Sequence, residues 1–500
     1  MTHGCRRSMR PDRTLSRLHL ALGFVVLAAL CLPMADLTLA GHDPWDTLGR
    51  MALGFLRPDF TGIEAIGRAL ALTVAFAVAG VALGGLAGLV MAPFYHRRAV
   101  RTLAIALRSV HELFWALILI QMLGISPAAG VLALALPYAG IFAKVLSEML
   151  DEADPRPARV LGPGTDALSR FVWARAPLVA RDMAGYALYR VECGLRSSAV
   201  LGFVGLPTLG FQLDTVFRQG DYGAASAIMI LYVALIASVR VWMRPRLAPL
   251  WLVAALVVLA QVSHPPMGEG ALLRFLTEDI VPAPIRQGDW AGLVPWLGMI
   301  MRTMVLPGLA NTILVGQIAL VVAGLVALVG MALPAPRVTG RVGALVGHLV
   351  LVVLRSFPEY MLAYLLMQAF GPSMLPAILA LGLHNGAIIG HLLARQAVGR
   401  PLRPDAPRGA TLWAWEYLPR LFGPFLALLL YRWEIILRET AIMGVLGIAT
   451  LGFYLDDAIG ELRMDRAMVI LVATGLMSGT VEALSRRLRA RTATASVRMG

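Results

Sequence analysis

The sequence from Tyr189 to Phe211 reads Tyr-Arg-Val-Glu-Cys-Gly-Leu-Arg-Ser-Ser-Ala-Val-Leu-Gly-Phe-Val-Gly-Leu-Pro-Thr-Leu-Gly-Phe. A second copy, from Tyr431 to Phe453, reads Tyr-Arg-Trp-Glu-Ile-Ile-Leu-Arg-Glu-Thr-Ala-Ile-Met-Gly-Val-Leu-Gly-Ile-Ala-Thr-Leu-Gly-Phe, at an offset of 242 residues. Each copy has Tyr-Arg-x-Glu, an Arg four residues after the Glu, and glycines at the same positions. The chain therefore contains an internal repeat around which the rest is organised.

The repeat continues upstream at a second offset. Leu107–Glu112 reads Leu-Arg-Ser-Val-His-Glu and matches Leu354–Glu359, which reads Leu-Arg-Ser-Phe-Pro-Glu, 247 residues later. Leu132–Leu134 matches Leu379–Leu381 at the same offset. The offset falls to 242 across the polar segment that follows, so the second copy is five residues shorter there.

The composition is that of an integral membrane protein. Hydrophobic residues make up 58% of the 500 residues, charged residues only 15%, and the mean hydropathy is +0.73. Long apolar runs indicate membrane-spanning helices rather than a β-barrel. The net charge of +14 comes from arginines that cluster between these runs. This is the positive-inside pattern of a membrane protein, which argues against nucleic-acid binding.

The apolar runs predict an all-α membrane protein with about twelve transmembrane helices, as two parallel repeats of six related by an axis along the membrane normal. The expected spans are 18–32, 65–93, 103–123, 128–150, 189–211, 224–242, 250–262, 309–333, 343–370, 374–393, 421–453 and 467–484.

An even number of spans in each half places both termini on one side, which the arginines assign to the cytoplasm. The first apolar run follows several arginines and could be a signal peptide, but a symmetric molecule needs it as a retained helix. The expected parts are a basic cytoplasmic arm at 1–17, a first half at 18–247 with a cytoplasmic loop at 148–178, a second half at 248–484 with a loop at 395–420, and a basic tail at 485–500.

Four Arg and Glu pairs with a spacing of four residues lie in or beside the apolar runs. A helix places such residues on one face, so each pair can neutralise itself where an isolated charge costs about 2.5–3.5 kcal/mol. Alternatively, Arg196 and Arg438 meet near the repeat axis and present positive charge to an anionic solute. The pairs are Glu192 with Arg196, Glu434 with Arg438, Arg108 with Glu112, and Arg355 with Glu359.

Glycines recur at equivalent positions after these charges. Small residues allow helices to pack closely. Alternatively, backbone without side chains forms a bend or gate beside the solute. The sequence leaves both interpretations open. The glycines are Gly202, Gly205 and Gly210 in the first copy, and Gly444, Gly447 and Gly452 in the second.

Motifs for hydrolysis or metal binding are missing from the sequence. There is no Gly-x-x-x-x-Gly-Lys-Ser/Thr phosphate loop, so we expect no ATP hydrolysis by this chain. Cys5, Cys31 and Cys193 have neither disulfide nor metal-ligand spacing, and no His-x-x-x-His pattern occurs. We therefore expect no bound cofactor or metal, and an intramembrane enzyme has no supporting motif.

Two features resemble a known family. The segment from Glu148 to Pro177, which includes Gly164, resembles the cytoplasmic loop of ABC-importer permeases. Leu354–Glu359 and the two Tyr-Arg-x-Glu-x-x-x-Arg blocks with their glycines resemble the phosphonate-transport permeases, over most of both halves. The chain thus resembles two such permeases fused in tandem.

The resemblance implies the fold of a type I ABC importer permease in the bacterial inner membrane. It implies two cytoplasmic ATPase subunits that hold ATP and Mg²⁺, and an extracytoplasmic solute-binding protein that delivers a phosphonate or related anion. The implied ATPase-coupling residues are Glu148, Gly164, Arg170, Pro177, Gly409 and Pro419. The candidate substrate-pathway residues are Glu192, Arg196, Gly205, Gly210, Glu434, Arg438, Gly447 and Gly452.

The chain also departs from this family. The family has Gly-Ala-Gly-Gly-Ile-Gly where this chain has Gly205–Gly210, and a proline where this chain has His111. The second loop, 395–420, is shorter than the first. An ABC permease for a different small anion therefore stays open, as does an ion-coupled secondary transporter, although the latter leaves the polar loops without a role.

Overall fold

The computed structural model describes residues 17–39, 44–61, 65–162, 164–263, 270–399, 402–403 and 405–497. This part of the chain contains helices and connecting segments but no β-strand. Eight of its helical segments are long and apolar enough to cross a membrane, or ten if each of two bent helix pairs counts as one crossing. The protein is therefore a helical, multi-pass membrane protein.

Length and hydropathy alone do not confirm two of the twelve expected spans. Helix α12 (Ala248–Ala260) is apolar but has only 13 residues, too few to cross a bilayer unaided. Helix α21 (Leu418–Val445) is long enough, but its middle carries the three charged motif residues and Glu439. The eight segments are Arg17–Met34, Ile66–Phe94, Pro127–Glu152, Tyr222–Trp242, Leu293–Gly330, Pro336–Ser356, Met374–Val398 and Met464–Arg491.

Each half is built on a bundle of three packed helices, and the pairing of helices is the same in both. The second helix of each bundle packs along the first, and the third packs against the first. The bundles are α3 (Ile66–Met91), α6 (Pro127–Glu152) and α9 (Ala176–Val200) in the first half, and α16 (Leu306–Gly330), α19 (Met374–Val398) and α21 in the second.

Close packing within each bundle depends on a ladder of glycines at every fourth residue. In the first half, Gly80, Gly84 and Gly88 lie on α3, and a Cβ on any of them would collide with α6. In the second half the glycines lie on the other helix, where Gly382 and Gly386 of α19 are pressed against α16. Glycine on one of two facing helices is enough to bring their backbones together.

The first helix of each half packs on the core of the other half. Helix α1 (Arg17–Cys31) lies against α16, where the Gln317 Nε2 atom donates to the Phe24 carbonyl oxygen at 3.2 Å. Helix α12, which begins the second half, lies against α3. Packing therefore crosses the expected boundary at residue 247 in both directions.

The expected spans 103–123 and 343–370 are each broken just before a motif glutamate. Helices α4 (Arg98–Ser109) and α5 (Glu112–Leu123) meet at an angle of 93°. Helices α17 (Pro336–Ser356) and α18 (Glu359–Phe370) are separated at Phe357 and Pro358, where proline restricts the preceding residue to extended backbone. At the equivalent break, the His111 Nδ1 atom caps α5 by accepting a hydrogen bond from the Leu113 N–H at 3.2 Å.

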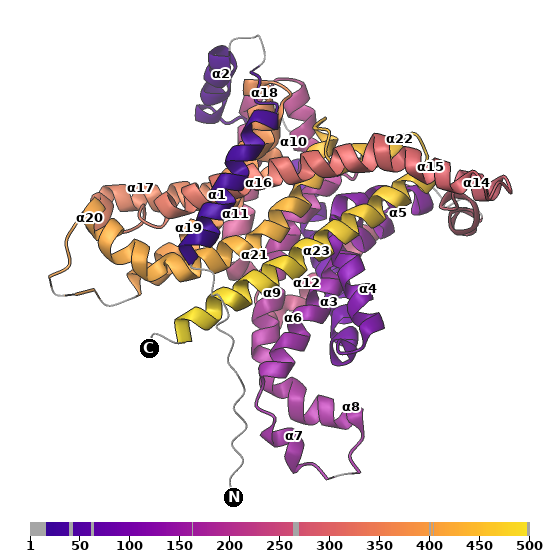
Figure 1. Ribbon diagram of the computed structural model, residues 1–500, viewed down its shortest axis with the longest axis horizontal. Coiled ribbons are helices and arrows are strands. Elements are labelled where there is room, and N and C mark those ends of the chain that lie inside the picture. The colour runs from indigo at the N-terminus through magenta and orange to yellow at the C-terminus, as the bar shows by residue number, and fades with distance from the viewer. Residues whose placement is uncertain are drawn as a thin grey trace, which may run out of the picture.

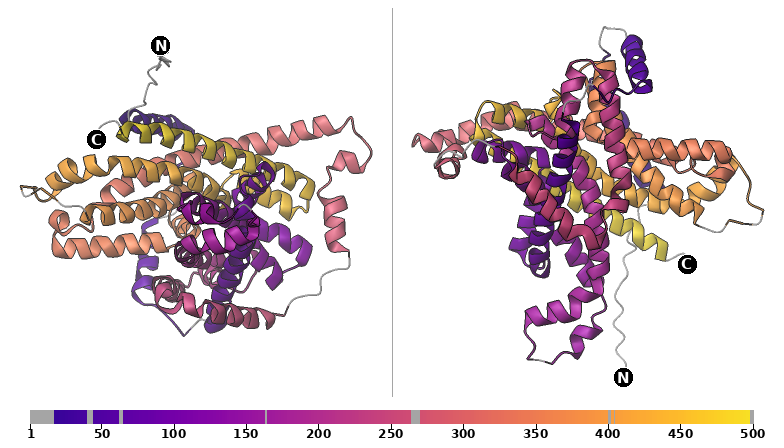
Figure 2. Two further views of the ribbon diagram at one scale, coloured as in Figure 1. Left: turned by 90° about the horizontal axis from the view of Figure 1, so that it is seen from below. Right: turned by 180° about the vertical axis from the view of Figure 1, so that it is seen from behind.

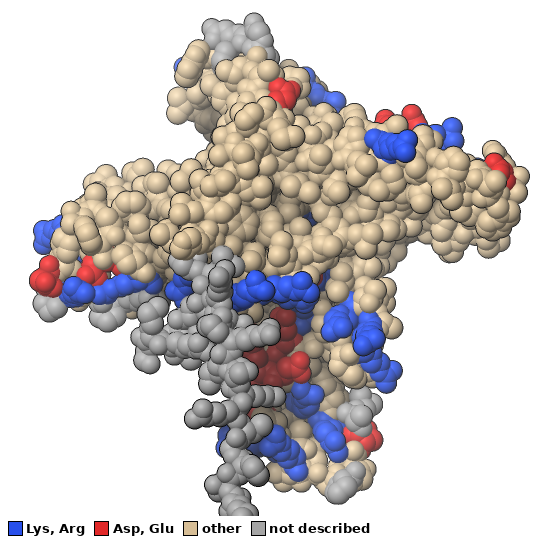
Figure 3. Space-filling view, viewed as in Figure 1, with Lys and Arg blue, Asp and Glu red and all other residues tan. Residues whose placement is uncertain are grey.

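The molecule has the outline of a cross (Figure 1). One arm ends at α7 (Arg156–Val160) and α8 (Ala167–Arg170) of the first loop, and another ends at α20 (Ala410–Leu412) of the second (Figures 1 and 2). In Figure 3 the charged side chains gather between these two arms, whereas the other arms are largely uncharged. A water-facing side therefore lies between the loop-bearing arms.

Candidate functional site

A polar cavity of about 250 Å³ lies where the two halves meet. The first half contributes residues from α4, α5, α6 and α9, and the second contributes residues from α18, α19 and α21. Its ionisable lining residues are Arg108, His111, Glu112, Tyr138, Lys144, Glu148, Tyr189, Arg190, Cys193, Arg196, Glu359, His384, Tyr431, Arg432, Glu434, Arg438 and Glu439.

The opening motif supplies one helical face to this cavity from each half. Successive lining positions are one to three residues apart and fall on one broad face of each α-helix. The lining residues are Tyr189, Arg190, Cys193, Arg196 and Ser197 from α9, and Tyr431, Arg432, Glu434, Ile435, Arg438 and Glu439 from α21. The repeat therefore builds the cavity from two equivalent helices.

The second residue of each motif is an arginine without a direct carboxylate partner. Arg190 donates from Nε and Nη2 to the Tyr186 hydroxyl, at 2.8 and 2.6 Å, and its guanidinium lies 4.9 Å from the centre of the Tyr186 ring. Arg432 donates from Nη1 to the Asn385 side-chain oxygen at 3.1 Å. In the described chain, neither arginine has a carboxylate oxygen within 4.0 Å. Sequence reasoning missed both, although each follows the motif tyrosine.

The two arginines predicted for the solute pathway have different partners. Arg196 pairs with Glu192 at 3.3 Å, as the spacing on one helix predicts. Arg438 does not pair with Glu434, because its Nη1 atom donates to the Arg108 backbone carbonyl at 2.9 Å. Glu434 instead accepts from the Arg108 Nη1 atom at 3.1 Å. The equivalent arginines are therefore neutralised to different extents.

The other two expected pairs, Arg108 with Glu112 and Arg355 with Glu359, are absent from the described ion pairs. The helix breaks before Glu112 and Glu359 are the physical reason, since a spacing of four residues shares a face only on a continuous helix. Glu112 lies 3.7 Å from His111, and Glu359 lies 3.6 Å from His384.

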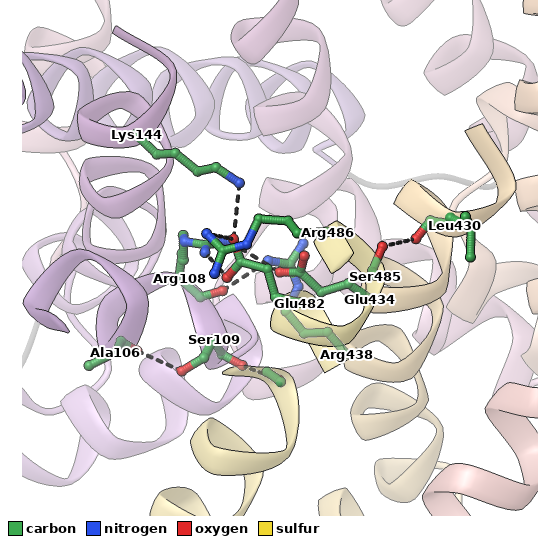
Figure 4. A network of polar contacts seen from close by, with 11 residues as sticks. Ala106, Arg108, Ser109, Lys144, Leu430, Glu434, Arg438, Glu482, Ser485 and Arg486 are labelled. Atoms are coloured by element: carbon green, nitrogen blue, oxygen red, sulfur yellow. Dashed lines mark hydrogen bonds and ion pairs between the residues drawn. The ribbon is translucent and has the colours of Figure 1, made fainter. Parts of the chain in front are cut away.

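Four ionisable side chains form a cluster that joins the halves, and a fifth, Arg486, lies 3.7 Å from Glu482 beside them (Figure 4). We call Arg108, Lys144, Glu434 and Glu482 the ion cluster. Arg108 donates to Glu482 as well as to Glu434, and the Lys144 Nζ atom donates to Glu482 at 3.1 Å. The Glu482 side chain is only 3% exposed. Sequence reasoning missed Lys144, although it is the sole lysine of the sequence and lies in an apolar run.

The predicted pathway glycines do not line the cavity in the described structure; they shape a turn beside it. Gly205 and Gly447 have φ values of +89° and +90°, which favour glycine. A Cβ on Gly210 would collide with the Ala199 carbonyl, and one on Gly452 with that of Ala441. Gly205 and Gly447 therefore form a bend, whereas Gly210 and Gly452 are packing residues, and the arrangement is the same in both halves.

Two buried threonines complete this turn. The Leu209 N–H donates to Thr73 Oγ1 at 2.9 Å, and the Leu451 N–H donates to Thr312 Oγ1 at 3.0 Å. Each bond ties the start of a helix after the turn, α10 (Leu209–Arg218) or α22 (Leu451–Gly460), to the first core helix of the same half. Sequence reasoning did not identify either threonine.

The predicted coupling residues of the first loop are spread along it. Glu148 lines the cavity, Gly164 lies in open space, and the Arg170 Nη2 atom donates to the Thr165 carbonyl of its own loop at 3.4 Å. Pro177 lies in the first turn of α9. Hydrogen bonds from Arg156 to Asp154 hold the pKa of that exposed carboxyl below its ordinary value.

In the second loop, the Gly409 N–H donates to the Arg337 carbonyl of α17 at 2.9 Å, and Pro419 lies in the first turn of α21. Both loops enter their long helix through a π-helical turn, η3 (Phe171–Arg175) and η8 (Trp413–Tyr417). The third residue of each turn is a tryptophan, and Trp173 and Trp415 are 78% and 76% exposed.

The chain is similar to known transport permeases. It is 25% identical over 462 residues to the phosphate-import permease protein PhnE of Mycolicibacterium smegmatis, covering 86% of this chain and 84% of that one. It is 31% identical over 239 residues to the phosphite transport system permease protein PtxC of Stutzerimonas stutzeri, covering 45% of this chain and 86% of PtxC.

A third relative is the putative cryptic phosphonate transport system permease protein PhnE2 of Escherichia coli, 29% identical over 21% of this chain and 88% of PhnE2. No protein-family model matches the chain. No solved structure matches it significantly. PtxC matches about one half of this chain, whereas PhnE matches nearly all of it, which fits a tandem fusion. The chain belongs to the family of phosphonate and phosphite ABC-transport permeases.

Proposed function

We propose that this protein is the transmembrane permease of an ATP-driven importer that moves a phosphonate or a related phosphorus oxyanion across the bacterial inner membrane. Its relatives are named for phosphate import, phosphite transport and phosphonate transport, all phosphorus oxyanion systems. The observation that carries the proposal is the cavity between the halves, with Arg190 and Arg432 at repeat-equivalent positions.

The two arginines suit a tetrahedral oxyanion. A guanidinium donates a rigid fork of N–H groups that matches phosphate oxygens, and it stays charged in the membrane. The neutral partners, Tyr186 and Asn385, orient Arg190 and Arg432 without a direct ion pair. Arg196, which pairs with Glu192, has less charge to offer. We therefore assign first contact with the anion to Arg190 and Arg432.

A topology of twelve spans in two parallel repeats, with both termini in the cytoplasm, fits this function. The matching helix bundles, the equivalent turns at Gly205 and Gly447, and the equivalent bonds to Thr73 and Thr312 support it. In this topology the short α12 spans with the help of flanking residues, and α21 spans because its charges face the cavity.

Transport then requires partner chains. Permeases of these systems are transport subunits, and the sequence lacks a phosphate loop, so ATP and Mg²⁺ belong to two separate ATPase subunits. We place these subunits on the two loops, through Gly164, Arg170 and Gly409 with the prolines Pro177 and Pro419 behind them. A binding protein delivers the anion to the opposite side. ATP binding shifts the permease between conformations only through its different affinity for each.

The test is ATP hydrolysis in liposomes by this chain with its ATPase and binding protein, in the presence of alkylphosphonates, phosphite or phosphate. One of these solutes should stimulate hydrolysis. Arg190→Gln or Arg432→Gln should raise the solute concentration that gives half-maximal stimulation by about tenfold to a hundredfold, which corresponds to the loss of one charge-assisted hydrogen bond. The exposed Arg302→Gln is the control and should behave as wild type.

Two outcomes would contradict the proposal. Hydrolysis that responds to none of these solutes would leave an ABC permease for a different anion. Failure of any ATPase to associate, with solute uptake driven by an ion gradient, would identify an ion-coupled secondary transporter instead.

A further inference from the structure

The ion cluster and Glu148 have a repeat-related counterpart set with a different charge balance. Offsets of 247 and 242 residues relate the two sets of positions. Arg108, Lys144, Glu148, Glu434 and Glu482 correspond in that order to Arg355, His391, Arg395, Glu192 and Arg240.

The counterpart set has arginines at two positions where the first set has carboxylates. The buried Glu482, which lies between Arg108 and Lys144, corresponds to Arg240, and Glu148 corresponds to Arg395. The one acidic residue that remains, Glu192, already pairs with Arg196 at 3.3 Å. We call Arg240, Arg355, His391 and Arg395 the basic cluster. Its arginines have no carboxylate oxygen within 4.0 Å among the residues that the structure describes.

Helix packing brings the basic cluster together. Helix α17, which carries Arg355, packs against α11 (Tyr222–Trp242), which carries Arg240, and against α19, which carries the other two members. Arg355 is within electrostatic range of one carboxylate, Glu192, and of three arginines, Arg196, Arg240 and Arg395. His391 is within range of Arg355, His348 and Arg395. The cluster therefore concentrates positive charge where the two halves meet.

The basic cluster also contains buried polar atoms without a partner. The Arg355 Nε and His391 Nδ1 atoms are buried and make no hydrogen bond within the described chain. A buried donor without a partner costs about 1–3 kcal/mol. The Arg108 Nε atom of the ion cluster is also unpartnered, so the two clusters differ in their carboxylates and not in this respect. Arg240 and Arg395 are exposed, which keeps the cluster accessible from water.

We propose that the basic cluster is a second anion site, which binds a phosphate group in the role that the Glu482 carboxylate has in the ion cluster. A phosphate group has the acceptor oxygens that several arginines can share, and its charge offsets their mutual repulsion. The site is separate from the solute cavity, because none of its four residues lines that cavity. It does not depend on the proposed transport function.

The test uses the purified full-length chain without ATPase or binding protein, so that its result is independent of transport. Isothermal titration with inorganic phosphate is done on delipidated protein in detergent, and retention of phosphatidylglycerol against phosphatidylcholine is measured in nanodiscs. Phosphate binding identifies a free oxyanion as the ligand, and phosphatidylglycerol retention alone identifies a lipid headgroup. Either result must weaken at least tenfold in Arg355→Gln and Arg395→Gln, and must persist in the cavity variant Arg190→Gln.

A charge-swap variant keeps the test decisive if Arg355→Gln fails to fold. Arg240→Glu installs the carboxylate that the ion cluster has at Glu482. We expect this variant to unfold at a higher temperature than the parent chain and to lose phosphate or phosphatidylglycerol binding. Ligand binding that is unchanged in both Arg240→Glu and Arg395→Gln, or no binding of either ligand to the parent chain, would overturn the proposal.

Discussion

The Arg108 Nη1 atom donates to the Glu434 Oε1 atom at 3.1 Å, although 326 residues separate the two in sequence. Arg108 ends α4 in the first half, and Glu434 belongs to the Tyr-Arg-x-Glu motif of the second. The bond joins the halves beside the cavity, so a movement of one half against the other must stretch or break it.

Loss of the buried carboxylate in the ion cluster should destabilise the protein. Glu482→Gln leaves Lys144 without its carboxylate partner and removes one of two from Arg108, and breaking a buried pair costs about 3 kcal/mol. The midpoint of thermal unfolding in detergent measures this change. In the double variant Lys144→Met with Glu482→Gln, the loss should be smaller than the sum of the single losses. Additive losses would show that Lys144 and Glu482 do not interact.

Removal of either threonine hydroxyl that supports the turn should lower the thermal stability of the protein by a similar amount. Thr73→Val and Thr312→Val preserve shape but leave the Leu209 and Leu451 N–H groups without an acceptor, at a cost of about 1–3 kcal/mol each. Thermal unfolding of the single variants should give similar shifts. Thr303→Val is the control, because the Thr303 hydroxyl is exposed and bonds only within its own helical segment, at 2.9 Å. A control shift as large as the others would contradict the assignment.

A methyl group at the crowded glycines should not be tolerated. Gly210→Ala and Gly452→Ala place a Cβ against the Ala199 and Ala441 carbonyls, and overpacking of this kind costs about 1–3 kcal/mol. The yield of folded protein by size-exclusion chromatography, together with thermal unfolding, measures the effect. Gly479→Ala, at a helical position with open space, should be neutral. Normal folding of both crowded variants would show that the turn relaxes.

The exposed tryptophans of the loops should anchor the ATPase subunits. Aromatic side chains are common binding hot spots, worth about 2 kcal/mol or more when removed. Trp173→Ala and Trp415→Ala should each weaken ATPase association by about thirtyfold in a pull-down titration. Trp290→Ala is the matched control, because Trp290 is 69% exposed but lies outside both loops. Unchanged association in the double loop variant would assign these tryptophans to the lipid surface instead.

The repeat could be found in the sequence because it consists of local patterns. The spacing of Tyr189, Arg190 and Arg196 already places them on one face of a helix, and the same spacing recurs from Tyr431. The all-helical membrane fold, the family and the pairing of Glu192 with Arg196 followed from such local patterns. Such a pattern lies within one helix, where the spacing of residues in the sequence determines which side chains share a face.

Tertiary structure decided the partners of the charges. Arg108 was expected to pair with Glu112, but the 93° bend between α4 and α5 separates these two residues. Arg108 forms ion pairs with Glu434 and Glu482 instead. The exchange of α1 and α12 between halves likewise has no local signature in the sequence. A charge inside a membrane protein takes whichever opposite charge folding brings near it. Sequence alone therefore defined the two halves, and only their docking determined the cavity and the charge balance of the two clusters.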